Sequence, residues 1–418
     1  MLRNYLKIAW KVLGRNRFFT FVSLFGISLT IGILLVLATL FDQIVGKHYP
    51  VGPDDHLVYV ATVSQEDGKG SGWNGGVGYY LYSNFIKKMK TPSGIGLISH
   101  TKSTNSFIGE NKLTFNLAYT DREYWDIHSY SFVEGKAYND SHLRDKARVA
   151  VINRATKDAY FGEKVSAIGK MLETDNVVYK VIGVVENVSE TAIYQYADIY
   201  IPLSLATQEL KNPDLIGEFT AIFKGESASD IARINEEYND LVAKLEVPAA
   251  STGWKQDYNI ISSYSMSKIE RISSAFVIGQ KPQMAWLTLI LSLAMLMFML
   301  LPALNLINLN SSRISERSSE IGVRKAFGAN SMTLAWQFIV ENIVVTLIGG
   351  GLGLILALGI LEIIENSELI THADLGLQFN VFLFAIFLCL VFGLLSGVLP
   401  AYRMSKIQVV NALKGINS

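Results

Sequence analysis

Two short fragments contain the glycine and lysine residues of a phosphate-binding loop, but neither has the required spacing. Such a loop has the pattern GxxxxGK[ST] between a strand and a helix, so that backbone amides and the lysine converge on the phosphates. Gly68–Ser71 is wrongly spaced, and the stretch from Gly162 to Lys170 lacks the hydroxyl residue. We therefore expect that this chain does not bind ATP in that manner, holds no cofactor and is not an enzyme.

The histidines do not predict a metal site. The six of them show no HExxH or comparable ligand spacing. No GxSxG motif marks a nucleophilic serine, although a Ser/His/Asp triad assembles in space and needs no fixed spacing. We therefore assign no catalytic and no metal-binding residue.

A stripe of charges of both signs runs along residues 310–329 (NSSRISERSSEIGVRKAFGA). On a helix, positions i, i+3, i+4, i+7 and i+11 share one face, and they hold Arg313, Glu316, Arg317, Glu320 and Arg324. Gly328 could end that helix. The stripe is either a solvated face with weak internal ion pairs, each worth ~0.2–0.5 kcal/mol, or a docking surface for a soluble partner.

The elements on both sides of this stripe are apolar and long. Half of the 418 residues are hydrophobic and only 18% are charged. Four segments could form the ~20 residues of helix that cross a hydrocarbon core, namely residues 17–41, 284–309, 333–361 and 381–402. We predict an integral membrane α-helical protein with four transmembrane helices.

The distribution of basic residues predicts the orientation of these helices. Lysine and arginine gather in residues 1–16, in the loop 310–332 and in the tail 403–418, whereas the loop 362–380 is acidic. The positive-inside rule therefore places both termini in the cytoplasm. We expect a multi-pass protein of the bacterial inner membrane. A cleaved signal peptide is the alternative for the N-terminus, but its apolar core would be only ~7–15 residues long. Residues 1–16 predict a basic amphipathic helix in the membrane interface, or else a continuation of the first span.

Residues 42–283 are mostly polar and predict a large α+β extracytoplasmic domain of two lobes, inserted between transmembrane helices 1 and 2. Strands are expected at 57–63, 148–152, 177–185, 198–201 and 219–223, and a helix after Ser227. The glycine-rich stretch 68–78 is expected to be a mobile loop. The one cysteine, Cys389, excludes an intrachain disulfide, so the domain needs a hydrophobic core of its own.

The third apolar segment contains a cluster of glycines and one acidic residue. Gly349, Gly350, Gly351 and Gly353 remove side chains from one stretch and predict close helix packing, within a chain or between protomers. Glu341 lies near the cytoplasmic end of the segment, which favours a headgroup-level or helix-capping role over proton transport.

The loop and the last two apolar segments resemble a known family. The loop sequence SERSSEIGVRKAFGA, the segments 338–342 (FIVEN) and 347–350 (LIGG), and the C-terminal stretch 392–403 (FGLLSGVLPAYR) are similar to the permease half of MacB-like and FtsX-like transporters. A weaker resemblance covers residues 148–153, 159–162, 168–170, 179–185 and 199–203 of the extracytoplasmic domain.

The resemblance implies a half-permease that dimerises, as a homodimer or heterodimer, and couples ATP hydrolysis to motion of the extracytoplasmic domains. In MacB the ATPase is fused ahead of the first helix, so a separate ATPase subunit that binds ATP and Mg²⁺ is expected here. The family's ATPase-contact loop corresponds to Arg313, Glu316, Arg317, Glu320, Ile321, Arg324 and Lys325. A periplasmic adaptor or other periplasmic protein and membrane lipids are further expected partners, whereas the equal numbers of basic and acidic residues, 37 each, give no reason to expect nucleic acid.

Two other classes of function remain open. One is a mechanotransducing regulator of a cell-wall hydrolase, as in the FtsX branch, and the other is a membrane-tethered receptor without an ATPase. A secondary transporter is disfavoured, because four spans with a bulky domain offer no obvious midplane site.

Overall fold

The computed structural model divides the chain into two compact units. The helical unit comprises the chain up to Asp42, Thr288–Leu369 and Asp374–Ser418, and the α/β unit comprises Gln43–Leu287 and Ile370–Ala373. The structure describes residues 17–405 except 53–54, 68, 70, 247–259, 276–282, 295, 298–299, 301–303, 305–306, 308–317, 328–329, 368, 374 and 377–378. The predicted interfacial helix 1–16 and most of the tail 403–418 lie outside the described residues.

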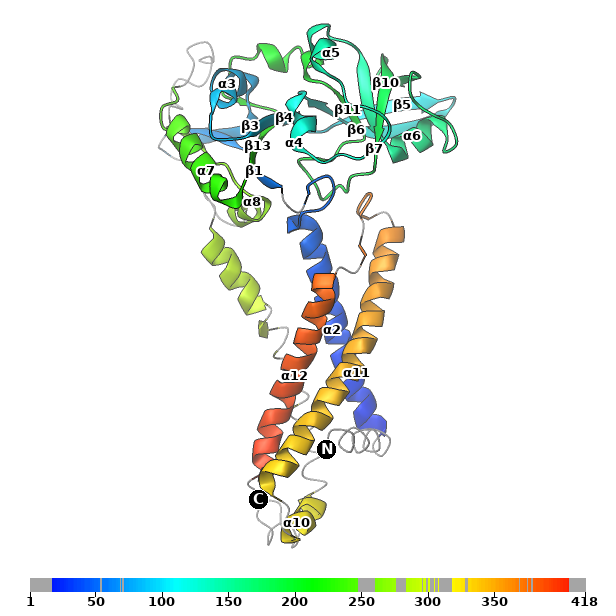
Figure 1. Ribbon diagram of the computed structural model, residues 1–418, viewed down its shortest axis with the longest axis vertical. Helices are drawn as coiled ribbons and strands as arrows, with labels where there is room; N and C mark the ends of the chain where they lie inside the picture. The colour runs from blue at the N-terminus through cyan, green and yellow to red at the C-terminus, as the bar shows by residue number, and fades with distance from the viewer. Residues whose placement is uncertain are drawn as a thin grey trace. The chain divides into compact units, whose positions relative to one another are not determined.

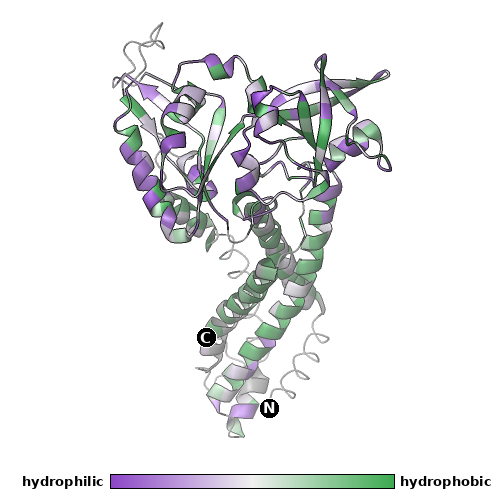
Figure 2. Cartoon of the chain, turned by 45° about the horizontal axis from the view of Figure 1, so that its top comes forward, coloured by the Kyte–Doolittle hydropathy of each residue, from purple (hydrophilic) through white to green (hydrophobic). Residues whose placement is uncertain are grey.

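The helical unit contains α2 (Arg17–Val45), α10 (Ser318–Ala326), α11 (Ser331–Asn366) and α12 (Phe379–Ser405). Its three long helices, α2, α11 and α12, are apolar, whereas the short helix α10 is polar (Figure 2). Among the described residues, Thr20–Val45 and Met332–Asn366 are long and apolar enough to cross a membrane, and Met284–Ala294 and Val381–Leu394 are shorter apolar helices. The first and third predicted spans are thus matched by helices of sufficient length, and the other two spans stay predictions.

The α/β unit contains short helices and a mixed sheet (Figure 1). Its α-helices are α3 (Tyr79–Asn84), α4 (Glu123–Ile127), α5 (Asp140–Arg144), α6 (Arg154–Phe161), α7 (Ala228–Val242) and α8 (Lys268–Ala275). Its strands are β1 (His56–Val60), β2 (Val63–Glu66), β3 (Gly72–Val77), β4 (Gly94–Ser99), β5 (Lys102–Ile108), β6 (Asn111–Thr120), β7 (Phe132–Gly135), β8 (Val149–Asn153), β9 (Met171–Thr174), β10 (Val177–Val185), β11 (Ile199–Pro202), β12 (Ile216–Gly217), β13 (Phe219–Gly225) and β14 (Ile260–Ser263).

The described strands pair in the order β14-β2-β3-β13-β4-β6-β11-β8-β10-β7. Strands β10 and β8 are parallel, as are β11 and β6, and the other pairs along this path are antiparallel. The path narrows where β4 meets β6, at the pair Ile98 and Thr120. Because the sheet is continuous through this pair, the division into two lobes stays a prediction.

Most strand predictions for this unit are confirmed. The strand expected at 177–185 coincides with β10, and those expected at 148–152, 198–201 and 219–223 match β8, β11 and β13 to within two residues. The segment 57–63 is divided between β1 and β2. The helix after Ser227 is α7, whose N-terminus is closed by a capping box between Ser227 and Asp230.

The prediction of a mobile loop at residues 68–78 is wrong for Gly72–Val77, which form strand β3. This strand pairs with β2, β12 and β13. A Cβ atom on Gly76 would lie 2.6 Å from the carbonyl oxygen of Phe219, so the glycine allows two backbones to approach more closely than a side chain would permit. Here glycine marks a close strand contact and not a flexible connection.

A cluster of buried aromatic and polar side chains lies in the core of the α/β unit. Tyr124, Tyr130 and Tyr200 all donate hydrogen bonds to the backbone oxygen of Gln195, at 3.2, 2.7 and 2.7 Å. His128 Nδ1 lies 2.8 Å from the Tyr124 carbonyl oxygen, which requires a proton on Nδ1 and leaves Nε2 as the acceptor for the Gln195 amide at 3.3 Å. Burial lowers the pKa of His128 to about 4, so this ring is neutral at physiological pH.

Candidate functional site

The predicted ATPase-contact face is only partly described. Arg313, Glu316 and Arg317 lie outside the described residues. Glu320 and Ile321 lie in helix α10, where the structure describes the backbone but not these side chains. Arg324 and Lys325 lie in the last turn of α10, where Arg324 is exposed and Lys325 is half-buried. The structure therefore places four of the seven predicted residues on one short helix.

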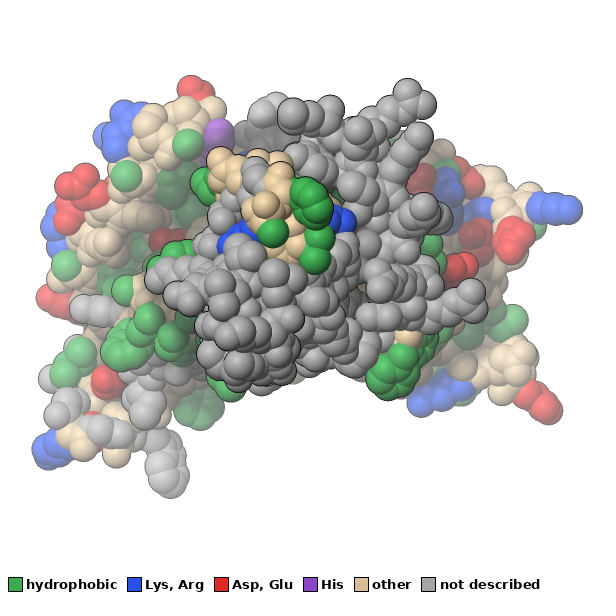
Figure 3. All heavy atoms as spheres, turned by 90° about the horizontal axis from the view of Figure 1, so that it is seen from below, with side chains coloured by type: hydrophobic (Ala, Val, Ile, Leu, Met, Phe, Trp, Pro, Cys, Tyr) green, Lys and Arg blue, Asp and Glu red, His purple; other side chains and the backbone are tan. Residues whose placement is uncertain are grey.

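The end of α10 also presents apolar side chains that the charge pattern did not indicate. Phe327 is 88% exposed and Val323 is 43% exposed, and the two are joined by a backbone hydrogen bond of 3.1 Å from Phe327 N to Val323 O. Figure 3 shows hydrophobic and basic side chains next to each other on the described part of this end of the chain. An exposed aromatic beside an arginine is the composition found at the centres of protein–protein interfaces. The sequence contains this signal as Phe327, three residues after Arg324.

Three of the four predicted packing glycines lie against neighbouring helices of the same unit. A Cβ atom on Gly349 would lie 2.7 Å from Ile27 Cγ2, and one on Gly353 would lie 2.7 Å from the backbone oxygen of Ser28, both on α2. A Cβ atom on Gly350 would overlap the sulfur of Cys389 on α12. Gly351 has no atom of the described residues within 4 Å of its Cβ position. The first three glycines thus let α11 approach α2 and α12 closely.

The partner helices contribute small residues of their own to these contacts. Gly32 on α2 lies one turn after Ser28, and its Cβ would lie 3.1 Å from the backbone oxygen of Gly353. On α12, the Cβ of Gly393 would lie 2.7 Å from Thr346 Oγ1, and that of Gly397 would lie 3.4 Å from the Ile339 Cα. Small residues four apart on each helix are a pattern typical of close transmembrane packing. In the sequence, the α11 glycines stand out as a cluster, whereas the small residues of α2 and α12 are recognised only from these contacts.

Glu341 is buried in the helical unit, with only 6% of its surface exposed. Helix α11 begins after Asn330, whose side chain caps it by accepting a 2.9 Å hydrogen bond from Met332 N. Glu341 therefore lies inside α11 and does not cap the N-terminus of that helix, and its headgroup-level role stays a prediction.

Comparison with known families covers both halves of the chain. Residues 20–241, more than half of the chain, match the model of the MacB-like periplasmic core domain. Residues 292–409 match the model of the FtsX-like permease C-terminal region.

Individual relatives are similar over nearly the whole chain. The macrolide export ATP-binding/permease protein MacB of Acinetobacter baylyi is 22% identical, over 99% of this chain and 59% of the relative. The pyoverdine export ATP-binding/permease protein PvdT of Pseudomonas savastanoi pv. phaseolicola is 24% identical, over 99% of this chain and 59% of the relative. The chain thus spans about three-fifths of the length of these relatives.

Among solved structures, the periplasmic region of MacB from Actinobacillus actinomycetemcomitans is similar with a TM-score of 0.35 and 15% identity, covering 53% of this chain and 94% of that one. The first family model covers most of α2 and of the α/β unit. The second covers the part of the chain that contains α10, α11 and α12. The chain therefore belongs to the MacB-like and FtsX-like permease family of ABC (ATP-binding cassette) transporters.

Proposed function

We propose that the chain is the permease subunit of a MacB-type ABC transporter, which couples ATP hydrolysis by a separate ATPase subunit to mechanical motion of its periplasmic domain. The observation that carries the proposal is the pair of family matches, one to a periplasmic core and one to a permease region, in a single chain. The 418 residues contain no GxxxxGK[ST] motif, so we assign the binding of ATP and Mg²⁺ to the partner and no enzymatic activity to this chain.

The proposed contact with the ATPase is the end of α10 and the charged residues before it. Phe327 supplies an apolar surface that burial against a partner would stabilise by ~1.5–3 kcal/mol. Arg324 and Lys325 supply charges that would fix the orientation of the partner. A contact of this kind needs both the apolar surface and the charges. Arg324 and Lys325 lie in the last turn of α10, and Phe327 is the first residue after that helix.

The packing of the helical unit supports a mechanical route from this contact. Helix α11 begins at Ser331, only a few residues after α10 ends. At Gly353 and Gly350 of α11 there is no room for a side chain, because Ser28 on α2 and Cys389 on α12 lie too close. Closely packed helices move as rigid bodies, since their interface cannot deform without overlap. Strand β1 follows α2 in the chain after a short connection, so we expect a displacement of α2 to be passed to the α/β unit.

The names of the relatives suggest the direction of transport. Relatives named for macrolide and pyoverdine export support the export of a substrate. We propose that the substrate is extruded from the periplasmic side. We propose that two permease protomers form the working complex, in the inner membrane and with cytoplasmic termini. An FtsX-like regulator of a cell-wall hydrolase would use the same helices without moving cargo, and a tethered receptor would have no ATPase.

A charge-swap variant tests the proposal. Glu320→Arg together with Arg324→Glu should reduce the stimulation of ATPase turnover by the permease, while membrane insertion remains intact. Glu365→Arg, an exposed charge reversal near the other end of α11, is the matched control and should leave ATPase turnover unchanged. Normal coupling in the double variant would contradict the assignment of this helix.

A further inference from the structure

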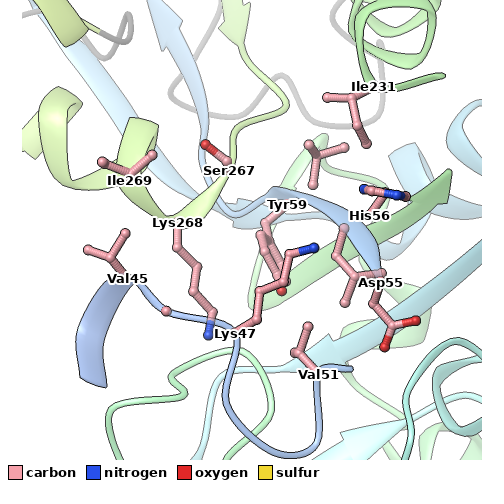
Figure 4. A pocket seen from close by; sticks show the side chains of 13 residues that line it. Val45, Lys47, Val51, Asp55, His56, Tyr59, Ile231, Ser267, Lys268 and Ile269 are labelled. Carbon is pink, nitrogen blue, oxygen red and sulfur yellow. The ribbon is translucent and has the colours of Figure 1, made fainter. Parts of the chain in front are cut away.

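A pocket of ≈ 200 Å³ in the α/β unit lies next to the end of α2 (Figure 4). Four segments form it: the end of α2 with the linker that follows, strand β1, helix α7 through Ile231, and the start of α8. Its lining includes Val45, Lys47, Val51, Ile231, Lys268 and Ile269. Pockets that enclose a whole small ligand typically measure ~300–1,000 Å³. This pocket therefore has the size to receive one end of a longer molecule.

The pocket combines an apolar wall with a lysine for which the described part of the chain supplies no counter-ion. Lys268 is half-buried, and burial lowers the pKa of its ammonium group. Among the described residues no carboxylate pairs with it. The pocket's carboxylate, Asp55, accepts instead from Lys224 Nζ at 2.8 Å and from Gly52 N at 2.7 Å. A half-buried ammonium without a partner is unfavourable, and an external anion would offset that cost.

Chain connectivity places one wall of this pocket at the end of an apolar helix. Val45 is the last residue of α2, and Thr20–Val45 is long and apolar enough to cross a membrane. A residue at the end of such a helix lies at the bilayer surface. Figure 4 shows Lys268 reaching from the start of α8 toward the linker that carries Lys47. The molecule at a bilayer surface that carries both an anion and an apolar chain is a phospholipid.

We propose that this pocket binds one anionic membrane phospholipid, with its phosphate on Lys268 and the adjoining carbon chain against Val45, Val51 and Ile269. Such a lipid contacts the linker from the first span and the helix that precedes the second apolar segment. It therefore bridges the two segments that connect the α/β unit to the apolar helices. The binding does not depend on the ATPase partner.

Lipid retention by the full-length chain tests the proposal. The chain is reconstituted in nanodiscs of phosphatidylcholine with a minor fraction of phosphatidylglycerol, and the lipid retained after detergent extraction is counted by native mass spectrometry. Lys268→Gln should lower phosphatidylglycerol retention about fivefold, the effect of removing one basic residue near a lipid surface. Lys268→Arg keeps the charge and should retain the lipid. Lys180→Gln, an exposed lysine on β10, is the matched control and should have no effect. Equal retention in Lys268→Gln and the control would overturn the proposal.

Photocrosslinking gives a second measurement that does not require removal of the lysine. A photoreactive amino acid in place of Ile269 should crosslink to phosphatidylglycerol, whereas the same group in place of Ile193, which is 63% exposed, should not. Crosslinking of Ile269 to a non-lipid amphiphile from the native membrane, or to protein alone, would contradict the lipid assignment.

Discussion

Replacement of Gly353 by alanine should destabilise the helical unit through a backbone clash. The new Cβ would lie 2.7 Å from the backbone oxygen of Ser28 and 3.1 Å from the backbone nitrogen of Gly32. Ordinary contact begins at 3.4 Å, so the distance from Ser28 must widen from 2.7 Å to at least 3.4 Å. Both neighbouring atoms belong to the backbone of α2, so no side-chain rotation relieves the overlap.

The size of the effect follows from this displacement. Overpacking of a close interface by one methyl group typically costs ~1–3 kcal/mol. A gap of about 0.5–1 Å also removes a quarter to a half of the dispersion energy between the separated atoms. We therefore expect Gly353→Ala to lower the free energy of unfolding of the helical unit by about 2 kcal/mol. Gly351→Ala, with no atom of the described residues within 4 Å of its Cβ, is the matched control and should change it by no more than ~0.5 kcal/mol.

The chain provides its own probe for this measurement. Cys389 is the one cysteine, is 4% exposed and lies in the core of the helical unit. Its modification by a thiol reagent, followed at increasing dodecyl sulfate in mixed micelles, reports the opening of the unit. Equal labelling curves for Gly353→Ala and Gly351→Ala would refute the reasoning from helix contact.

Three further predictions test other parts of the account. Gly350→Ala should be destabilising because its Cβ would overlap the Cys389 sulfur, and the added Cys389→Ala change should restore about 1 kcal/mol of stability, measured by circular dichroism. As pH falls from 7 to 4, His128 takes up a proton in the unfolded chain but stays largely neutral in the folded chain, where its pKa is about 4. This difference should lower the free energy of unfolding by up to about 3 kcal/mol. Burial raises the pKa of Asp121 to about 7, so protonation of Asp121 stabilises the folded chain over the same pH range. Because His128→Gln keeps Asp121, the difference in acid unfolding between the native chain and this variant reports His128 alone. Phe327→Ala should weaken ATPase binding about tenfold without changing the melting temperature, and Leu369→Ala, 76% exposed, is the control in a pull-down titration.

The sequence was sufficient to predict the elements whose pattern is local. Strand β10 consists largely of β-branched residues in a short apolar run, and its limits were predicted correctly. Strand β3 was missed because its glycines have the composition of a loop. Their role depends on the approach of Phe219 and Gly217, which lie far along the chain. Propensity alone does not contain that information.

The candidate sites show the same limit. The glycines of α11 predicted close packing, but their contacts with Ser28 and Cys389 depend on helices distant in sequence. The charge pattern predicted a role for Arg324 but none for Phe327, because the exposure of Phe327 is seen only in the structure. The pocket beside Lys268 could not be predicted, since its lining comes from segments more than 200 residues apart.

The most direct test of the central claim is purification of the tagged chain from its native membrane in mild detergent, with identification of co-purifying proteins and an assay of ATP hydrolysis. We expect a stoichiometric ATPase subunit whose turnover depends on the end of α10, at Arg324, Lys325 and Phe327. Recovery of the intact permease dimer with no ATPase partner would contradict this expectation and would favour a membrane-tethered receptor.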